Sequence, residues 1–196
     1  VHRGGKLVVK FGILGAGRIG KVHAGTIANS PRASVAYVAD AIADAASSLA
    51  GSVGAQVLSV DEVIASDVDA ILIATPTDTH ADLIERAARA GKAILCEKPV
   101  SLSVERIEAC LPVVEKAGVP LMIGFNRRFD PNFASLQKRL RDGAVGEVEI
   151  VTIISRDPAP PPVSYIERSG GLYRDMMIHD FDMARFLVGE EFVTVQ

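Results

Sequence analysis

A glycine-rich turn between an apolar run and a helical segment most constrains what this chain can fold into. Residues 7–14 are mostly apolar, as is typical of a buried strand in a parallel sheet. Gly15, Gly17 and Gly20 then form a G-x-G-x-x-G turn, and residues 18–29 have a helical pattern. Isolated glycines also mark ordinary turns, but the order strand, glycine turn, helix is typical of a dinucleotide-binding βαβ unit.

Strand-like and helical segments alternate from residue 7 to about residue 124. We expect strands at 7–14, 34–39, 56–59, 70–74, 93–96 and 120–124. We expect helices at 18–29, 40–50, 61–66, 78–90 and 104–117, with Asp61 able to cap the third. This βαβα alternation predicts an α/β fold with a doubly wound parallel sheet of the Rossmann type.

The regular alternation of strand-like and helical segments ends at Gly124. We expect a helix at 131–142, a long strand at 145–155, a proline-rich surface loop at 157–162, a helix at 170–185 and the start of a strand at 192–195. One long strand cannot stabilise a sheet by itself. The sequence therefore predicts a Rossmann domain at 1–124 and a partial α+β second domain at 125–196, in a chain that stops partway through that domain.

The overall composition is that of an ordinary globular protein. The 196 residues are 48% hydrophobic and 23% charged, with a net charge of −3. No basic patch indicates nucleic-acid binding, and no apolar run is long enough for a membrane helix. We expect no secretory signal. Cys96 and Cys110 lack metal-ligand spacing, so we expect no metal site and a reducing cytoplasmic location.

The choice of cofactor depends on Asp40, which ends the second expected strand 20 residues after Gly20. A carboxylate at this position accepts hydrogen bonds from the adenosine ribose hydroxyls and repels a 2′-phosphate. Neither Ala41 nor Ile42 offers a compensating cation. The sequence therefore favours NAD over NADP.

Two further motifs follow expected strand ends, where ligands bind in open α/β sheets. Lys98, in Glu97-Lys98-Pro99, is placed near the nicotinamide, although a surface lysine beside an acid is an equally simple interpretation. Residues 75–80 either line the nicotinamide ribose or form a plain turn with a helix cap.

The helix expected at 170–185 carries polar residues on one stripe. Asp175, His179 and Asp182 align at about 100° per residue, between apolar neighbours. Ordinary explanations exist: Asp175 lies near a helix start, His179 could be a core histidine, and Asp182 could pair with Arg185. A substrate pocket would also explain why charged groups lie among apolar ones.

Taken together, these motifs resemble the glucose–fructose oxidoreductase and inositol dehydrogenase (Gfo/Idh/MocA) family, over residues 7–189. Within that family, residues 170–187 are most similar to the inositol 2-dehydrogenase branch. The resemblance implies a Rossmann domain followed by a domain built on a large open sheet, through which members often form homotetramers. It also implies a catalytic triad of Lys98, Asp175 and His179. The matching segments are Gly15–Gly20, Ala74–Pro76 with His80, Glu97–Pro99, Asn126–Asp130, and Gly170-Gly171 followed by Asp175 and His179.

The chemistry of alcohol oxidation agrees with this triad. We assign His179 as the general base for the hydroxyl proton, because histidine titrates near neutral pH. Asp175 would orient the ring and bind a substrate hydroxyl, and Lys98 would stabilise the developing alkoxide. For Asp182 we expect an ion pair. Arg127 could bind the polyol or the cofactor, or pair with Asp130. Arg156, Asp157 and Tyr165 are further candidates for substrate contact.

The expected function is NAD-dependent oxidation of a cyclic polyol, with myo-inositol giving 2-keto-myo-inositol. The alternatives are a related sugar or polyol dehydrogenase and a non-catalytic dinucleotide-binding module. We expect a homo-oligomer if the second domain is complete. Expected substrate contacts are Lys98, Arg127, Asp175 and His179. Expected cofactor contacts are Gly15, Gly17, Arg18, Ile19, Gly20, Asp40, Thr75, Pro76, His80, Glu97 and Lys98.

Overall fold

The computed structural model describes residues 8–161, 163, 166 and 169–196. The chain divides into two compact units, Val1–Gly124 and Phe125–Gln196. Leu7, where the first strand was expected to begin, and Tyr165 lie outside the described residues. Within the described part of the chain, no helix is both long enough and apolar enough to cross a membrane.

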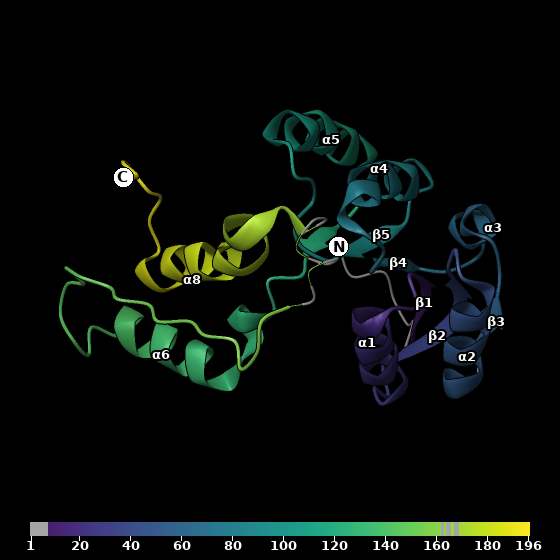
Figure 1. Ribbon diagram of the computed structural model, residues 1–196, viewed down its shortest axis with the longest axis horizontal. Helices are drawn as coiled ribbons and strands as arrows, with labels where there is room; N and C mark the ends of the chain where they lie inside the picture. The colour runs from purple at the N-terminus through teal and green to yellow at the C-terminus, as the bar shows by residue number, and fades with distance from the viewer. Residues whose placement is uncertain (1–7, 162, 164–165, 167–168) are drawn as a thin grey trace. The chain divides into compact units, whose positions relative to one another are not determined.

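Six parallel strands form one sheet in the first unit, in the order β3-β2-β1-β4-β5-β6 (Figure 1). This is the strand order of a doubly wound Rossmann sheet, with its switch point between β1 and β4. The predicted α/β class is therefore confirmed. The strands are β1 (Val9–Leu14), β2 (Ala33–Ala39), β3 (Gln56–Val57), β4 (Ala70–Ile73), β5 (Ala93–Cys96) and β6 (Leu121–Ile123).

The sheet carries a hydrophobic core on each face, because successive side chains of a strand point to opposite sides. Ile13 and Leu72 belong to the core formed with α1 and α2, whereas Leu14 and Ile71 belong to the core formed with α3, α4 and α5. The two groups of helices lie on opposite sides of the strands in Figure 1. The helices are α1 (Arg18–Ala28), α2 (Ala43–Val53), α3 (Val60–Ala65), α4 (His80–Arg89) and α5 (Val104–Ala117).

Three of these helices begin at other residues than the sequence predicted. The second starts at Ala43 instead of residue 40, because Asp40 accepts a hydrogen bond from the Ile42 amide and remains in the turn. The third is capped by Ser59, in a reciprocal capping box with Glu62, and not by Asp61. The fourth is preceded by a 3₁₀ turn, η1 (Thr77–Thr79).

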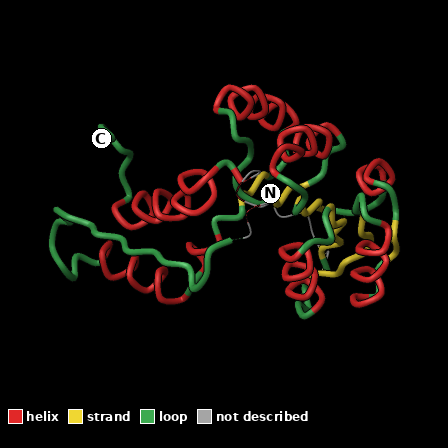
Figure 2. The backbone as a smooth tube through the Cα atoms, in the orientation of Figure 1, coloured by secondary structure: helices red, strands yellow, loops and turns green. Residues whose placement is uncertain are grey.

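The second unit is built mainly from helices and extended loops (Figure 2). Asp130 caps α6 by accepting hydrogen bonds from the amides of Asn132 and Phe133, at 2.8 and 3.3 Å. The final helix, α8, packs against α6 and against the short turn η2. The bounds are η2 (Asn126–Phe129), α6 (Pro131–Arg141), η3 (Tyr173–Met177) and α8 (Ile178–Val188).

The two strands predicted for the second unit are wrong for the structure as it stands. Residues 145–155 and 192–195 contain no strand, and no described residue pairs with them in a ladder. The reason is that strand character depends on hydrogen bonds from a neighbouring strand, which local sequence cannot supply. Ile150 and Ile154 are accordingly 85% and 76% exposed.

The helix predicted at 170–185 is not a uniform α-helix. Residues Tyr173–Met177 form a π-helical turn, and the α-helix begins at Ile178. Hydrogen bonds from residue i to i+5 widen the turn, so a constant step of 100° per residue does not hold there. The single stripe through Asp175, His179 and Asp182 is therefore interrupted. Asp182 is buried, whereas Asp175 and His179 are half-buried.

Candidate active site

The glycine turn is shaped by close backbone contacts. Gly15 has a φ of +103°, which disfavours side chains, and a Cβ there would overlap the Ala74 carbonyl. A Cβ at Gly20 would overlap the Gly15 carbonyl, so this glycine lets α1 begin directly against the turn. A Cβ at Gly17 would meet nothing within 4 Å. The space over Gly17 is therefore open to a ligand that approaches the backbone.

The amino end of α1 fits a phosphate group. Gly17 is its N-cap and provides no side-chain hydrogen bond, and the first turn contains no acid. By contrast, Ser103 caps α5 and Asp130 caps α6 through their side chains. Uncapped backbone N–H groups and the positive end of the helix dipole are what a pyrophosphate requires.

Asp40 lies beside this turn at the end of β2. One carboxylate oxygen accepts a hydrogen bond from the Ala16 amide at 2.6 Å, and the other accepts from the Ile42 amide at 2.8 Å. Each oxygen keeps acceptor capacity, so the carboxylate can still receive ribose hydroxyls. Asp40 thus holds the glycine turn as well as fitting its expected role toward the ribose.

The turn after β4 is held by its own hydroxyls and by a buried histidine. The Thr75 and Thr79 hydroxyl oxygens lie 2.6 Å apart, and the Thr79 hydroxyl donates to the Pro76 carbonyl at 2.7 Å. His80 is 1% exposed, with Nδ1 2.7 Å from the Pro99 carbonyl oxygen and Nε2 2.8 Å from the Thr75 carbonyl oxygen. In this conformation His80 therefore links two turns at the sheet edge and presents no surface to a cofactor.

Lys98 follows β5 in the turn that His80 holds. The Glu97 amide donates to the Ile73 carbonyl at 2.9 Å, and the Lys98–Pro99 bond is cis. Lys98 is half-buried beyond the carboxyl end of β5, which pairs with β4, one of the two strands at the switch point. This edge of the sheet is where ligands bind in doubly wound folds.

His23, in the middle of α1, was missed by the reading of the sequence. Its Nε2 lies 2.6 Å from a carboxylate oxygen of Glu97. The two residues are 74 positions apart, so no local pattern marks the pair. However, a helix that follows a glycine turn begins at the carboxyl ends of the strands. The position of His23 in this helix was therefore the one sequence signal for a contact with residues that follow those strands.

In the second unit, two arginines of η2 hold α8 by ion pairs. Arg127 binds Asp180 at 2.5 Å and donates to the Ser155 hydroxyl at 3.0 Å, so its expected pairing with Asp130 is wrong. Arg128 binds both carboxylate oxygens of Asp182, at 2.6 and 2.8 Å. The hydrogen bonds that Arg128 donates to the Asp182 carboxylate raise the pKa of Arg128 above its ordinary value.

The alternative pairing of Asp182 with Arg185 is also wrong. Arg185 turns outward and binds Glu191 instead. Asp182 is 5% exposed, so its bidentate partner Arg128 provides the compensation that a buried carboxylate requires. The ion pair expected for Asp182 exists, but with a partner 54 residues away.

Asp175 lies in η3 and His179 in the first turn of α8, both half-buried. Among the described residues, no group of three or more His, Cys, Asp or Glu could hold a metal ion.

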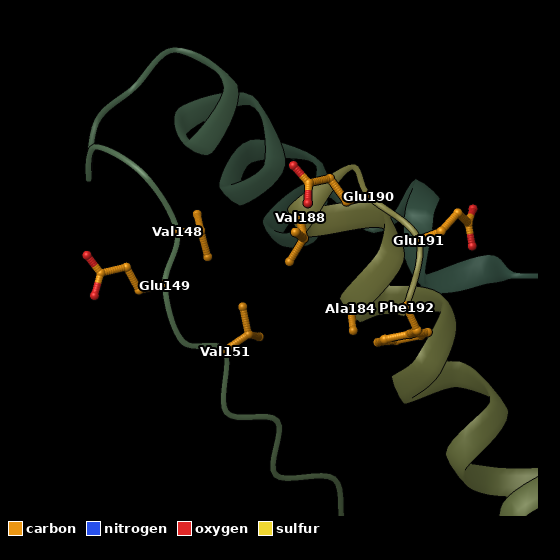
Figure 3. A pocket seen from close by; sticks show the side chains of 8 residues that line it. All are labelled: Val148, Glu149, Val151, Ala184, Val188, Glu190, Glu191 and Phe192. Carbon is orange, nitrogen blue, oxygen red and sulfur yellow. The ribbon is translucent and has the colours of Figure 1, made fainter. Parts of the chain in front are cut away.

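A shallow pocket in the same unit involves none of these residues. It lies between the extended segment 148–151 and the carboxyl end of α8, and its lining is mainly apolar with three glutamates (Figure 3). The catalytic candidates of this unit therefore lie elsewhere on η3 and α8. The pocket is lined by Val148, Glu149, Val151, Ala184, Val188, Glu190, Glu191 and Phe192.

Comparison with known families decides what kind of Rossmann protein this is. Residues 9–125 match the model of the GFO/IDH/MocA oxidoreductase family, described as an NAD-binding Rossmann fold. Residues 133–196 match the model of a GFO/IDH/MocA C-terminal domain. The chain belongs to the GFO/IDH/MocA family. The glycine turn, the uncapped end of α1 and Asp40 are the parts of this family member that fit NAD.

Named relatives agree with this membership. The inositol 2-dehydrogenase of Rhizobium meliloti is 60% identical over 96% of this chain and 58% of the relative. A crystal structure of a putative myo-inositol dehydrogenase from Sinorhizobium meliloti superposes with a TM-score of 0.91, at 61% identity, over 93% of this chain and 56% of that one.

A more distant structure was solved with ligands. The scyllo-inositol dehydrogenase of Lactobacillus casei, with bound NAD(H) and scyllo-inositol, has a TM-score of 0.79 and 28% identity, over 94% of this chain and 57% of that one. The present chain thus spans a little over half the length of the relatives it matches.

Proposed function

We propose that this protein is an NAD-dependent dehydrogenase that oxidises a secondary alcohol of a cyclic polyol, with myo-inositol converted to 2-keto-myo-inositol. The observation that carries the proposal is the 60% identity to an inositol 2-dehydrogenase over 96% of the chain. The geometry supports it through an uncapped helix end over an open Gly17, and through a lysine at the ligand-binding edge of the sheet.

The proposed reaction uses Lys98, Asp175 and His179. His179 takes the proton of the substrate hydroxyl as general base. Lys98 donates a hydrogen bond to the same oxygen and stabilises its developing negative charge. Asp175 orients the His179 ring and binds a neighbouring hydroxyl. Bound NAD, held by the glycine turn and Asp40, would supply the acceptor for the hydride that leaves the hydroxyl-bearing carbon.

The two units would divide this work. Residues 1–124 would bind the dinucleotide, and residues 125–196 would form part of the substrate site. Arg127 could contact a polyol only with those N–H groups that its bond to Asp180 leaves free. Arg156 and Asp157 remain candidates for further substrate contacts. We also propose a homo-oligomer, a tetramer by family resemblance, working in the cytoplasm, where its two free cysteines stay reduced.

A second candidate is a dehydrogenase of the same family with a different polyol or sugar as substrate. The specific observation that favours it is the likeness to a protein solved with scyllo-inositol. The third candidate, a dinucleotide-binding module without catalysis, is not favoured by the relatives, which carry dehydrogenase names.

A substrate panel separates these candidates. Purified protein is mixed with NAD or NADP and with myo-inositol, scyllo-inositol or a hexose, and the reduced cofactor is followed by its absorbance. The proposal predicts the highest kcat/KM with myo-inositol and NAD. Preference for another polyol would support the second candidate, and NAD binding without any turnover would support the third.

A further inference from the structure

We propose that His23 is a positioning residue for Lys98 and acts through the carboxylate of Glu97. The proposal rests on the proposed function for the role of Lys98 at the reacting oxygen. It assigns a task to His23, which lies outside the predicted triad and outside the glycine turn.

The contact between His23 and Glu97 is close and shielded. Nε2 of the ring lies 2.6 Å from the carboxylate oxygen, and the two side chains are only 24% and 15% exposed. A hydrogen bond that is shielded from water is stronger than an exposed one, because water competes less for both groups. Such a contact holds the Glu97 side chain in one orientation.

Gly124, just after β6, is a second close neighbour of the Glu97 carboxylate. A Cβ at Gly124 would lie 3.1–3.2 Å from the carboxylate atoms of Glu97, tighter than ordinary packing. The Gly124 amide also donates to the Cys96 carbonyl at 2.8 Å, which holds this backbone against the end of β5. The carboxylate therefore has an imidazole as a hydrogen-bond partner and space beside it that only a glycine at position 124 leaves open.

Both neighbours of Lys98 are thus held by histidines. Glu97 is bound by His23, and the Pro99 carbonyl lies 2.7 Å from Nδ1 of the buried His80. With both flanking residues fixed, the turn limits the directions in which the Lys98 side chain can leave the backbone. A catalytic group must be held in this way, because a small displacement costs much of the rate.

The pair also joins the two ends of the proposed cofactor site. His23 lies on α1, whose amino end fits the pyrophosphate, and Glu97 directly precedes Lys98 at the proposed reaction site. A shift of α1 when the pyrophosphate binds would be passed through one contact to the residue before Lys98. This gives a physical reason for a histidine in the middle of α1, because its rigid ring spans the distance between the helix and Glu97.

The test measures the reactivity of the Lys98 amine and needs no turnover. Trace acetylation followed by peptide mass spectrometry compares the labelling rate of Lys98 with that of the exposed Lys116 in the same protein. In His23→Ala the Glu97 carboxylate is released and can turn toward the Lys98 amine, where a contact with the carboxylate would hinder attack of the amine on the reagent. We expect Lys98 labelling to slow by about threefold or more relative to Lys116.

Two matched variants on α1 serve as controls. His23→Gln keeps an N–H donor for the carboxylate, so labelling should return toward the wild-type rate. Thr26→Ala removes an exposed hydroxyl that bonds only within the helix, and it should change nothing. The proposal is overturned if folded His23→Ala labels Lys98 at the wild-type rate. A loss of NAD affinity or stability in that variant would then mean that His23 has a purely structural role.

A second variant keeps the test valid if His23→Ala does not fold. Gly124→Ala retains every charge and moves only the Glu97 carboxylate, by a few tenths of an ångström. The proposal expects slower Lys98 labelling here too, with a smaller change. The positioning role is refuted if Gly124→Ala labels Lys98 at the wild-type rate while His23→Ala either does not fold or also labels at the wild-type rate.

Kinetics separates this proposal from the proposed function. If the wild type oxidises myo-inositol, His23→Ala should lower kcat with little change in KM, since the substrate contacts remain. If the wild type oxidises no polyol, the proposed function fails. The effect of His23 on Lys98 labelling then still decides the positioning role.

Discussion

At Gly20 one absent methyl group allows α1 to begin directly on the glycine turn. A Cβ at Gly20 would lie far inside contact distance of the Gly15 carbonyl oxygen. Gly25 lies on the same helix, but a Cβ there would meet nothing within 4 Å. The two glycines therefore offer a steric comparison within one element.

We predict that Gly20→Ala weakens NAD binding by about tenfold or more, because overpacking of about 1–3 kcal/mol must be relieved by opening the turn. Gly25→Ala should bind NAD as the wild type does and gain stability from the better helix former. Isothermal titration with NAD measures both. Equal affinities for the two variants would contradict the role of the glycine turn.

At His179 the prediction concerns chemistry and not folding. His179→Ala should lower turnover of myo-inositol by about 100-fold or more, the usual scale of lost acid–base catalysis, while NAD binding is spared. Steady-state kinetics and NAD titration on the same preparation test this. Wild-type turnover in the variant would remove His179 from the role of general base.

At the scale of single elements, α8 shows how tertiary contacts overrule a local pattern. The π turn at its start breaks the predicted stripe, and its two acids, Asp180 and Asp182, are bound by Arg127 and Arg128 of η2. The Arg128 guanidinium also lies over the Phe186 ring, 5.4 Å from its centroid. These contacts fix the helix that carries His179.

We predict that Arg128→Ala lowers the free energy of unfolding of the second unit by about 2–3 kcal/mol, because the buried Asp182 carboxylate loses its bidentate partner. Arg185→Ala, which removes an exposed pair with Glu191, should cost no more than about 0.5 kcal/mol. Urea unfolding and amide exchange in α8 provide the measurement. Equal effects of the two substitutions would show that the Arg128 pair gives no special stability.

At the scale of the whole molecule, the two cysteines report on the first unit. Cys96 ends β5 and Cys110 lies in α5, and both thiols are fully buried and free. Burial raises the pKa of each thiol above its ordinary value, so little thiolate forms at neutral pH.

We therefore predict that neither cysteine reacts with a thiol reagent in the native protein within minutes, whereas both react at once in denaturant. A disulfide reagent that releases a coloured thiolate is used, and the absorbance of that thiolate gives the number of cysteines that have reacted. Rapid reaction of either thiol in the native state would mean that α5 opens from the sheet.

Much of the first unit could be predicted from sequence, because its signals are local. Apolar runs, glycine stops and the G-x-G-x-x-G turn predicted all six strands, and the helix at Val104–Ala117 was placed at its observed bounds. Helix starts were less certain, since they depend on which side chain caps the backbone, as at Asp40 and Ser59. The strands of the second unit failed because their partners cannot be found in local sequence.

By itself, the sequence determined the fold class and predicted which residues would bind a dinucleotide, because these depend on periodicity, on glycine sterics and on the spacing between Gly20 and Asp40. Only the tertiary structure decided which residues contact each other. His23 contacts Glu97, His80 links two turns, and the arginines of η2 bind α8. The physical reason is distance along the chain. Partners separated by 19 to 74 residues are selected by packing of whole elements, and no short pattern encodes that packing.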